Sequence, residues 1–303
     1  MDSIRSSKQS KSLIISAVLA ITGTNMVLAD GWDPNSKASN TDSIVNTRHN
    51  MTMSYLGGAS VNMDSARNDY AEVCVYCHTP HGANSTIGAP LWNRTNPGTS
   101  YTVYNKPLTS GQTASAPGVN SLICLSCHDG TVAIDSIINM PNRPGSKSYD
   151  PTQQTAQNDA FLSSWPDNSP IMHAKLSDCL LCHTSTNPFA PDFTAFLIGT
   201  DLRDDHPVGV SLPDTTIYDF NPTTGTAGNL SFYDTNSNGR ADSNELRFYN
   251  SGQGYEVECA SCHNPHGTPV NSAPVNGKHG GPLIPSFLRV KDQSTLCLTC
   301  HNK

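Results

Sequence analysis

The sequence predicts a mostly irregular fold that consists of loops with short α-helices and a few small β-hairpins. A short helix is expected at Asp69–Cys77, a pair of helices within residues 121–139, and a small hairpin around Tyr101–Tyr104. Only 36% of the 303 residues are hydrophobic, and 22 glycines and 21 prolines interrupt regular elements along the chain. All ten cysteines fall in five short motifs. The first residues of these motifs are 50, 55, 80 and 38 positions apart, which is too uneven for a repeat protein of fixed period. A chain this poor in apolar residues needs more than its own side chains to fill a core.

Each of the five motifs, numbered 1 to 5 in chain order, reads Cys-x-x-Cys-His, the attachment signature of c-type haem. Two thiols bond covalently to one porphyrin, and the next residue presents an imidazole to the iron as proximal ligand. The thioether residues are Cys74, Cys77, Cys124, Cys127, Cys179, Cys182, Cys259, Cys262, Cys297 and Cys300. The proximal histidines are His78, His128, His183, His263 and His301. We therefore expect a multihaem cytochrome c wrapped around an array of five haem c groups.

Other uses of paired cysteines fit the motifs less well. A zinc site needs two Cys-x-x-Cys pairs and does not require a histidine after each of them. A thioredoxin-like redox pair and the disulfides of a secreted protein also leave the five histidines without a purpose. Because no cysteine is left over, haem attachment is favoured over all three alternatives.

Residues 1–29 have the pattern of a secretory signal peptide. Three basic residues precede the apolar run 13–21, which is too short to span a bilayer, and Ala29 lies before a suitable cleavage point at Asp30. An uncleaved anchor is the alternative. We expect an exported chain of residues 30–303 without a transmembrane segment, located in the periplasm, at the cell surface or outside the cell.

The charge of the chain argues against nucleic acids and anionic membranes as partners. The formal net charge is −7, and removal of the signal peptide, which carries one acid and three bases, leaves about −9. The remaining chain offers about 55 residues per haem, and a peptide of that length buries little surface alone. We therefore expect the porphyrins to form most of the core and the haem-free chain to be largely unfolded.

Six histidines lie outside the motifs, which is one more than five irons need as distal ligands. Methionine is the other common distal ligand. We expect histidine on both sides of every iron, or nearly every iron, and we expect His279, in a glycine-rich loop, to be the spare one. The distal set is then His49, His81, His173, His206 and His266.

His81 and His266 each follow a proximal histidine by three residues, in the turns Thr79–Gly82 and Asn264–Gly267. The two axial ligands of one iron lie on opposite faces of the porphyrin, and a residue in the same short turn cannot reach the far face. If these two histidines bind iron, they bind the iron of a neighbouring haem, which brings two haems close together.

Residues 234–245, within an insert at 213–250, match the twelve-residue calcium loop with Gly239 at its sixth position. The predicted calcium ligands are Asp234, Asn236, Asn238, the Arg240 carbonyl, Asp242 and Glu245. The flanking segments 230–233 and 246–249 alternate in the manner of strands, so we expect a structural hairpin stapled by a calcium ion. An Asn/Gly-rich turn without calcium is the alternative.

Several stretches resemble multihaem cytochromes with doubled Cys-x-x-Cys-His motifs, which occur in anaerobic bacteria that respire metals and other external acceptors. They are residues 74–84, 89–94, 124–137, 205–209, the calcium-like loop, 257–267 and 287–303. The resemblance implies a bis-histidine electron carrier of the periplasm or cell surface. It also implies redox partner proteins or extracellular electron acceptors as partners. Some relatives form filaments with a continuous haem chain.

An electron-transfer protein and a haem enzyme, such as a pentahaem nitrite reductase, are the two functions to compare. The active haem of those reductases typically has lysine in place of the motif histidine, whereas all five motifs here end in histidine. We therefore expect an electron-transfer protein that is not an enzyme. A soluble periplasmic carrier is a further alternative.

We also expect head-to-tail polymerisation, because motif 5 lies at the C-terminal end of the sequence and places a haem at one end of the array. In that arrangement His49, on a polar N-terminal arm, binds a haem of the neighbouring molecule. The alternative is that His49 is an internal ligand of a monomeric carrier.

Overall fold

The structure is a computed structural model that describes a large part of the chain. The described residues are 43–51, 70, 72–95, 98–139, 174–187, 192–267, 287–290 and 293–302. The predicted signal peptide, His173 and His279 lie outside them. Among the described residues, no helix has the length and apolar character needed to cross a membrane.

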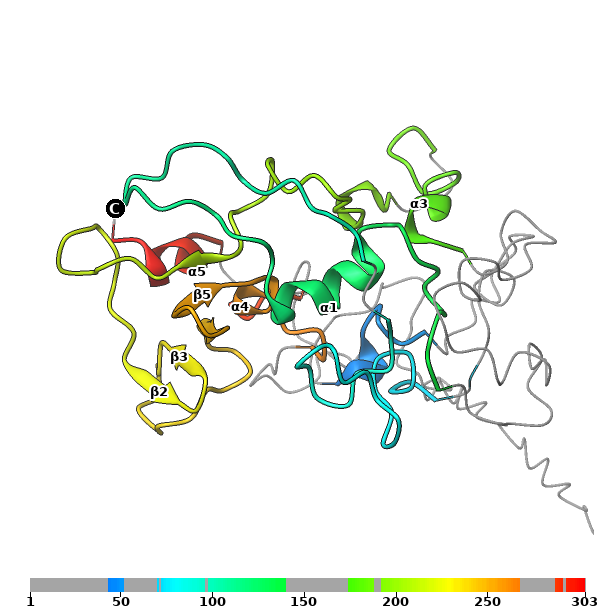
Figure 1. The fold of residues 1–303 in the computed structure, drawn as a ribbon, viewed down its shortest axis with the longest axis horizontal. Coiled ribbons are helices and arrows are strands. Elements are labelled where there is room, and N and C mark those ends of the chain that lie inside the picture. Colours follow the sequence, from blue (N-terminus) through cyan, green and yellow to red (C-terminus); the bar gives the residue numbers. More distant parts are fainter. Residues whose placement is uncertain are drawn as a thin grey trace, which may run out of the picture.

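Short elements separated by long loops make up this part of the chain (Figure 1). The α-helices are α1 (Val119–His128), α3 (Leu176–Cys179), α4 (Cys259–Cys262) and α5 (Gln293–Cys300), and the 3-10 helices are η1 (Ile44–Asn46) and η3 (Thr194–Phe196). The strands are β1 (Val210–Ser211), β2 (Gly225–Ala227), β3 (Leu230–Phe232), β4 (Arg247–Asn250) and β5 (Tyr255–Val257). Each of the four α-helices in the described residues contains at least one cysteine of a haem motif, so helical structure there is concentrated at motifs 2 to 5.

Motif 1 is the exception, because residues 73–77 form turns and not the short helix that the sequence predicts for Asp69–Cys77. The chain leaves the turn to pair with a distant segment. The Thr79 amide donates to the Leu91 carbonyl at 2.9 Å, and the Asn93 amide donates to the Cys77 carbonyl at 2.9 Å. These bonds require extended backbone directly after the motif, which ends helical geometry there.

The five strands form one antiparallel sheet in the order β1-β5-β4-β3-β2. In it β3 pairs with β4 in the register Leu230↔Tyr249, Ser231↔Phe248 and Phe232↔Arg247. The segments on either side of the calcium-like loop are therefore paired strands, as their alternating pattern predicts. Another predicted hairpin, around Tyr101–Tyr104, is absent from the described residues: Thr102 forms only a single parallel bridge, to Asp201.

The apolar core consists of small clusters that lie beside the motif cysteines. One contains Tyr76 and Ile137 and packs against Cys77, and another, of Tyr233, Leu246 and Phe248, packs against Cys300. Clusters of three or four buried side chains remove little surface from water, so they contribute only part of the free energy that an ordered chain needs.

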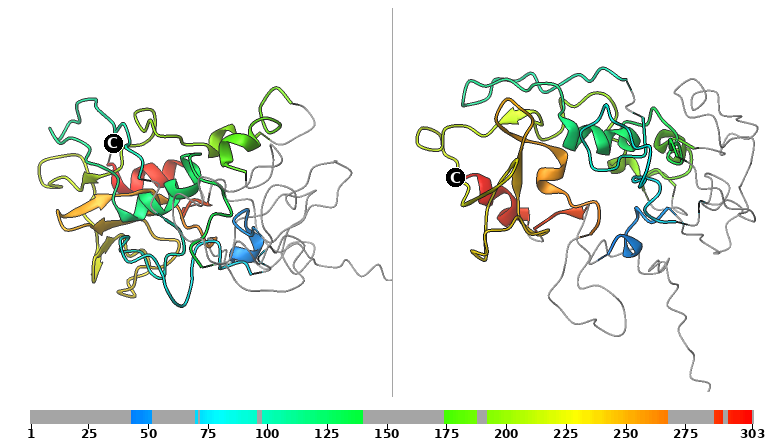
Figure 2. Two further views of the ribbon diagram at one scale, coloured as in Figure 1. Left: turned by 45° about the vertical axis from the view of Figure 1, so that its right-hand side comes forward. Right: turned by 60° about the horizontal axis from the view of Figure 1, so that its bottom comes forward.

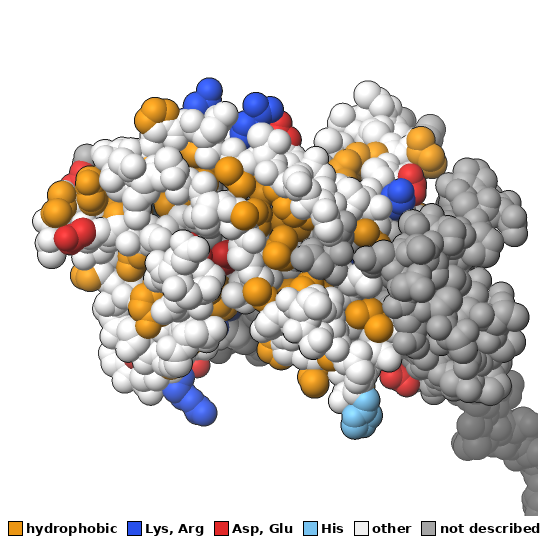
Figure 3. Space-filling view, viewed as in Figure 1, with side chains coloured by type: hydrophobic (Ala, Val, Ile, Leu, Met, Phe, Trp, Pro, Cys, Tyr) orange, Lys and Arg blue, Asp and Glu red, His pale blue; other side chains and the backbone are white. Residues whose placement is uncertain are grey.

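The helices that carry motifs 2 and 4 meet in the middle of the molecule. Figures 1 and 2 show α1 beside α4, with the sheet and α5 on one side and α3 on the other. Apolar side chains reach the surface over this middle region, while charged groups lie mainly around its rim (Figure 3). Motifs that are far apart in sequence are thereby gathered into one body.

Candidate haem-binding centre

All ten motif cysteines lie in described residues, and all ten are free thiols. Burial is the main cause that raises the pKa of Cys77 and of Cys262 to about 12. Across the described ranges no group of three or more His, Cys, Asp or Glu side chains gathers closely enough to hold a metal ion. Within the described residues the cysteines therefore take part in no such metal-binding group.

A hydrogen-bond network joins motif 2 to motif 4. The buried Glu258 carboxylate accepts hydrogen bonds from the Gly118 amide at 3.0 Å and from the Ser121 hydroxyl, and the same hydroxyl accepts one from the Cys259 amide at 2.9 Å. Burial raises the pKa of Glu258 to about 7. The Cys124 thiol contacts Cys259, and this contact is the main cause that raises its pKa. The first cysteines of two different haem motifs therefore touch.

At motif 1, the proximal His78 has a second imidazole beside it. The ring centre of His266, from the turn after motif 4, lies 6.1 Å from that of His78, with 17° between the ring planes. The Nδ1 of His78 lies 2.9 Å from the Pro90 carbonyl oxygen, to which it donates when it carries the proton. A bond of this kind fixes the ring and leaves its Nε2 available for a metal.

At motif 2, the proximal His128 also has a second imidazole beside it. The ring centre of His49 lies 6.1 Å from that of His128, with 68° between the planes. The Nδ1 of His49 lies 3.0 Å from the Pro265 carbonyl oxygen, and the Nδ1 of His128 lies 2.6 Å from that of Phe196. Burial, and then the nearby His128, lower the pKa of His49 to about 4. His49 is thus neutral at physiological pH, as an iron ligand must be.

These two spacings fit the iron of a haem between the rings. Bonds from imidazole nitrogen to a metal are about 2 Å long and the nitrogen lies about 1.1 Å from the ring centre, so two axial imidazoles have centres about 6.2 Å apart. Both observed distances are 6.1 Å. The donor set, two imidazoles, is also one that haem iron accepts.

Two buried donors beside motif 1 fit the carboxylate groups of a porphyrin. Trp92 Nε1 and Arg94 Nε are both shielded from solvent, and neither has a hydrogen-bond partner among the described residues. The Trp92 ring lies 5.9 Å from that of His78. A buried donor without a partner is rare, and an acceptor supplied by a bound group would satisfy it. The sequence does not show that either residue is buried, because that burial depends on the fold.

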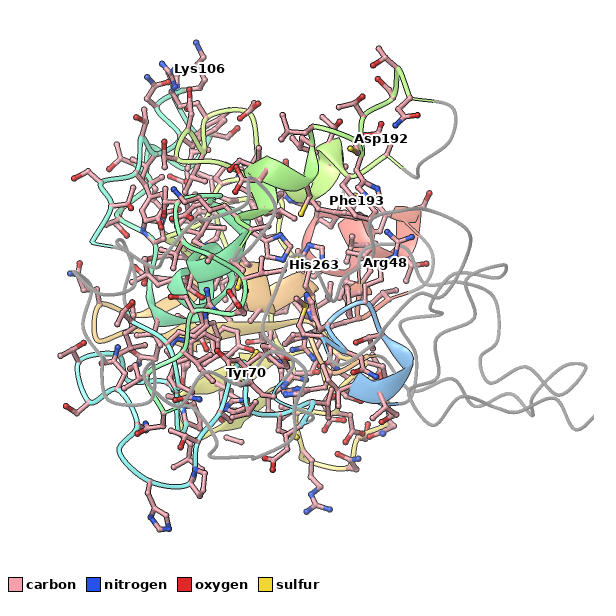
Figure 4. All side chains as sticks on the ribbon, turned by 90° about the vertical axis from the view of Figure 1, so that its right-hand side faces the viewer. Arg48, Tyr70, Lys106, Asp192, Phe193 and His263 are labelled. Atoms are coloured by element: carbon pink, nitrogen blue, oxygen red, sulfur yellow. The ribbon has the colours of Figure 1, made fainter. Side chains whose placement is uncertain are left out.

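The remaining predicted ligands lie in different surroundings. His206 is exposed but close enough to the motif 5 histidine, His301, to lower its pKa, although burial is the larger cause. His183 of motif 3 stacks on Phe193 with ring centres 3.9 Å apart. Figure 4 shows Phe193, Arg48 and the motif 4 histidine, His263, in one part of the molecule. His81 is exposed on the turn after motif 1.

His49 contacts His128 of its own chain, and the distance is that of a ligand pair. This contact favours the internal alternative over the prediction that His49 binds a haem in a neighbouring molecule. The polar arm is held by residues distant in sequence: the ring stacks on Phe287 at 4.2 Å, and its Nδ1 partner, Pro265, is 216 positions away. Local sequence around His49 could not indicate either contact.

The calcium-like loop is closed by hydrogen bonds to its carboxylates. Asp234 accepts from the amides of Asn238 at 3.1 Å and Gly239 at 2.8 Å, while Glu245 accepts from the Thr235 amide at 2.7 Å. Asp242 accepts from the side-chain amide of Asn236 at 2.8 Å. Glu245 is buried at the base of the loop, and Asn236 and Asn238 are exposed at its tip.

Comparison with known proteins identifies the class of this centre. The model of the family described as "Doubled CXXCH motif" matches residues 253–303, which contain motifs 4 and 5. This region is a haem-binding region of the c-type cytochrome kind, and its motifs indicate covalently bound haem c. No curated protein matches the chain.

Proposed function

We propose that the protein transfers electrons along five covalently bound haem c groups, with a histidine on each side of every iron, or nearly every iron, and that it is not an enzyme. When bound, haem c exchanges one electron between ferric and ferrous iron. A redox partner protein supplies the electrons, and a second partner or an extracellular acceptor takes them up. We place the protein outside the cytoplasm, where the chain wraps around its haems.

The observation that carries this proposal is the pair of imidazole couples, His78 with His266 and His49 with His128, at the spacing of two axial ligands. An iron held on both sides has no open position for a substrate, so such a site suits electron transfer better than catalysis. The contact between Cys124 and Cys259 supports close haems, which electron exchange between sites requires.

The test is the mass and spectrum of the haem-loaded protein. Its denatured mass is expected to equal the chain from residue 30 plus five haems, and the ferric protein is expected to be low-spin throughout. Full reduction then takes up five electrons per chain. A smaller mass would contradict the haem number, and a high-spin iron that binds nitrite would favour the enzyme alternative.

We also propose that residues 234–245 bind calcium with a structural role. The supporting observation is the loop itself, which is anchored by the buried Glu245 and joins the paired strands β3 and β4. Sites of this kind bind with dissociation constants on the order of 10⁻⁴ to 10⁻³ M.

Calcium at about ten times the dissociation constant is expected to stabilise the protein by about 1.4 kcal/mol through binding to the folded state. The Asp234→Ala, Glu245→Ala variant is expected to lose this calcium-dependent increase and to keep its haem spectrum. Asp214→Ala, in an exposed turn outside the loop, is the matched control. Thermal unfolding with added calcium and with chelator measures the effect, and a wild type insensitive to chelator would identify the loop as a plain turn.

Head-to-tail polymerisation remains a proposal of ours. Motifs 3 and 5, carried by α3 and α5, lie toward opposite sides of the molecule (Figure 1), and each exposes a leucine, Leu181 at 75% and Leu298 at 52%. Exposed apolar side chains at two ends of a molecule suit a head-to-tail contact between molecules, which repeats along a filament and does not close into a ring. Sedimentation of the wild type and of Leu298→Asp tests this: wild-type protein that stays monomeric at high concentration would refute it.

A further inference from the structure

We propose that histidines from distant segments complete two of the iron sites: His266 is the distal ligand at motif 1, and His49 is the distal ligand at motif 2. This assignment rests on the proposed function, since it requires haem c at these motifs. It goes further because it names the distal histidine of each of these two irons, which cannot be deduced from the order of residues in the chain.

The two couples share one geometry although they arise from unrelated segments. Each pairs a motif histidine with a histidine outside any motif, and each has ring centres 6.1 Å apart. Direct stacking brings ring centres much closer, as the 3.9 Å between His183 and Phe193 shows. A separation of 6.1 Å matches that of two imidazoles bound to one iron, and its repetition at two motifs argues against chance.

The turn after motif 4, Asn264–Gly267, holds both distal ligands in place. Within it, the Asn264 side-chain amide donates to the Gly267 carbonyl at 2.7 Å, and the His266 amide donates to the Asn264 side chain at 3.2 Å. Gly267 has a φ of +88°, which a side chain would disfavour. His266 projects from this turn, and its Pro265 carbonyl oxygen lies 3.0 Å from His49 Nδ1. One short turn therefore positions the distal ligands of two irons, neither of which belongs to its own motif.

The segment before motif 5 fixes the orientation of His49. The Phe287 ring stacks on that of His49 at 4.2 Å, with 14° between the planes, and the Asn264 amide donates to the Phe287 carbonyl at 2.8 Å. The face of the His49 ring and its Nδ1 are thus both constrained. Since the Nδ1 atoms of His78 and His128 also contact carbonyl oxygens, the ring planes at both motifs are set by the protein.

The angles between these planes make the two sites distinguishable. The planes are nearly parallel at motif 1, at 17°, and strongly crossed at motif 2, at 68°. Ligand planes that are parallel split the iron d orbitals more than crossed planes do. Parallel imidazoles therefore give a rhombic low-spin ferric signal in electron paramagnetic resonance, and crossed imidazoles give a highly anisotropic signal with one low-field feature.

The experiment compares His266→Ala and His49→Ala in the haem-loaded protein, with His279→Ala as the matched control. His266→Ala is expected to convert one rhombic low-spin centre into a high-spin centre. His49→Ala is expected to convert one highly anisotropic low-spin centre into a high-spin centre. Added imidazole is expected to restore each low-spin signal, which it would not do if the histidine only supported the fold. In a chain that lacks haem at motif 1 through Cys74→Ala and Cys77→Ala, His266→Ala is expected to create no further high-spin iron.

Mass spectrometry of each variant separates this assignment from the proposed function. A wild type without covalent haem would overturn the proposed function. Five haems with unchanged low-spin signals in both variants, or with the two losses exchanged, would overturn the assignment alone. A high-spin iron produced by His266→Ala in the chain without the motif 1 haem would also overturn it, because His266 would then bind another iron.

Discussion

Replacing Arg94 by leucine is expected to lower the free energy of unfolding by about 3 to 5 kcal/mol, because the change leaves several buried carbonyl groups without a donor. Arg94 is 1% exposed, and its guanidinium donates to the carbonyl oxygens of Ile134 at 2.9 Å, Ser126 at 2.8 Å and Ala133 at 3.0 Å. It thereby ties the segment after motif 1 to the end of α1 and to the turn that follows α1.

The matched control for Arg94 is Arg203→Leu. Arg203 forms an ion pair with Asp201 in which both side chains are about half exposed, so its loss is expected to cost less than about 1 kcal/mol. Chemical unfolding of the haem-loaded variants, followed by circular dichroism, compares the two. Equal effects of the two substitutions would show that the buried contacts of Arg94 contribute little.

The chain produced without haem attachment is expected to lack a cooperative unfolding transition and to be digested rapidly by protease. The described apolar clusters contain few side chains each, and motif cysteines line several of them. A ligand that binds only the folded state and fills most of the core contributes much of its stability. Haem-free protein with the protease resistance of the loaded protein would contradict this.

Removal of single haems is expected to produce unequal losses. Cys259→Ala with Cys262→Ala affects α4, which packs against α1 and β4, whereas Cys179→Ala with Cys182→Ala affects a motif with an exposed second cysteine and an exposed Leu181. The motif 4 variant is expected to be the less stable of the two by thermal unfolding. A motif 3 variant that is less stable than the motif 4 variant would contradict the larger structural role of α4.

Local features of the chain were predictable from sequence where they depend on neighbouring residues. The strands on either side of residues 234–245 follow from alternation, and α1 follows from the apolar pattern around Cys124 and Cys127. The second helix of the pair predicted within residues 121–139 is absent, because residues 131–139 form turns and bends. Motif 1 was wrongly predicted as helical, because pairing of residues 77–79 with residues 91–93 overrides local preference. The burial of Arg94 and Trp92 could not be predicted, since it depends on segments that meet only in the fold.

The sequence by itself predicts which residues attach haem and which histidine of each motif binds iron, because a Cys-x-x-Cys-His motif keeps its cysteines and its histidine close together in any fold. It also excluded His266 as the distal ligand of its own motif, since a short turn cannot reach both faces of a porphyrin. Only the tertiary structure decided which imidazoles lie next to each other. His266 lies next to His78, and His49 lies next to His128, because distant segments of the chain pack together. These segments are far apart in sequence, so their distance in space is set only when the whole molecule folds.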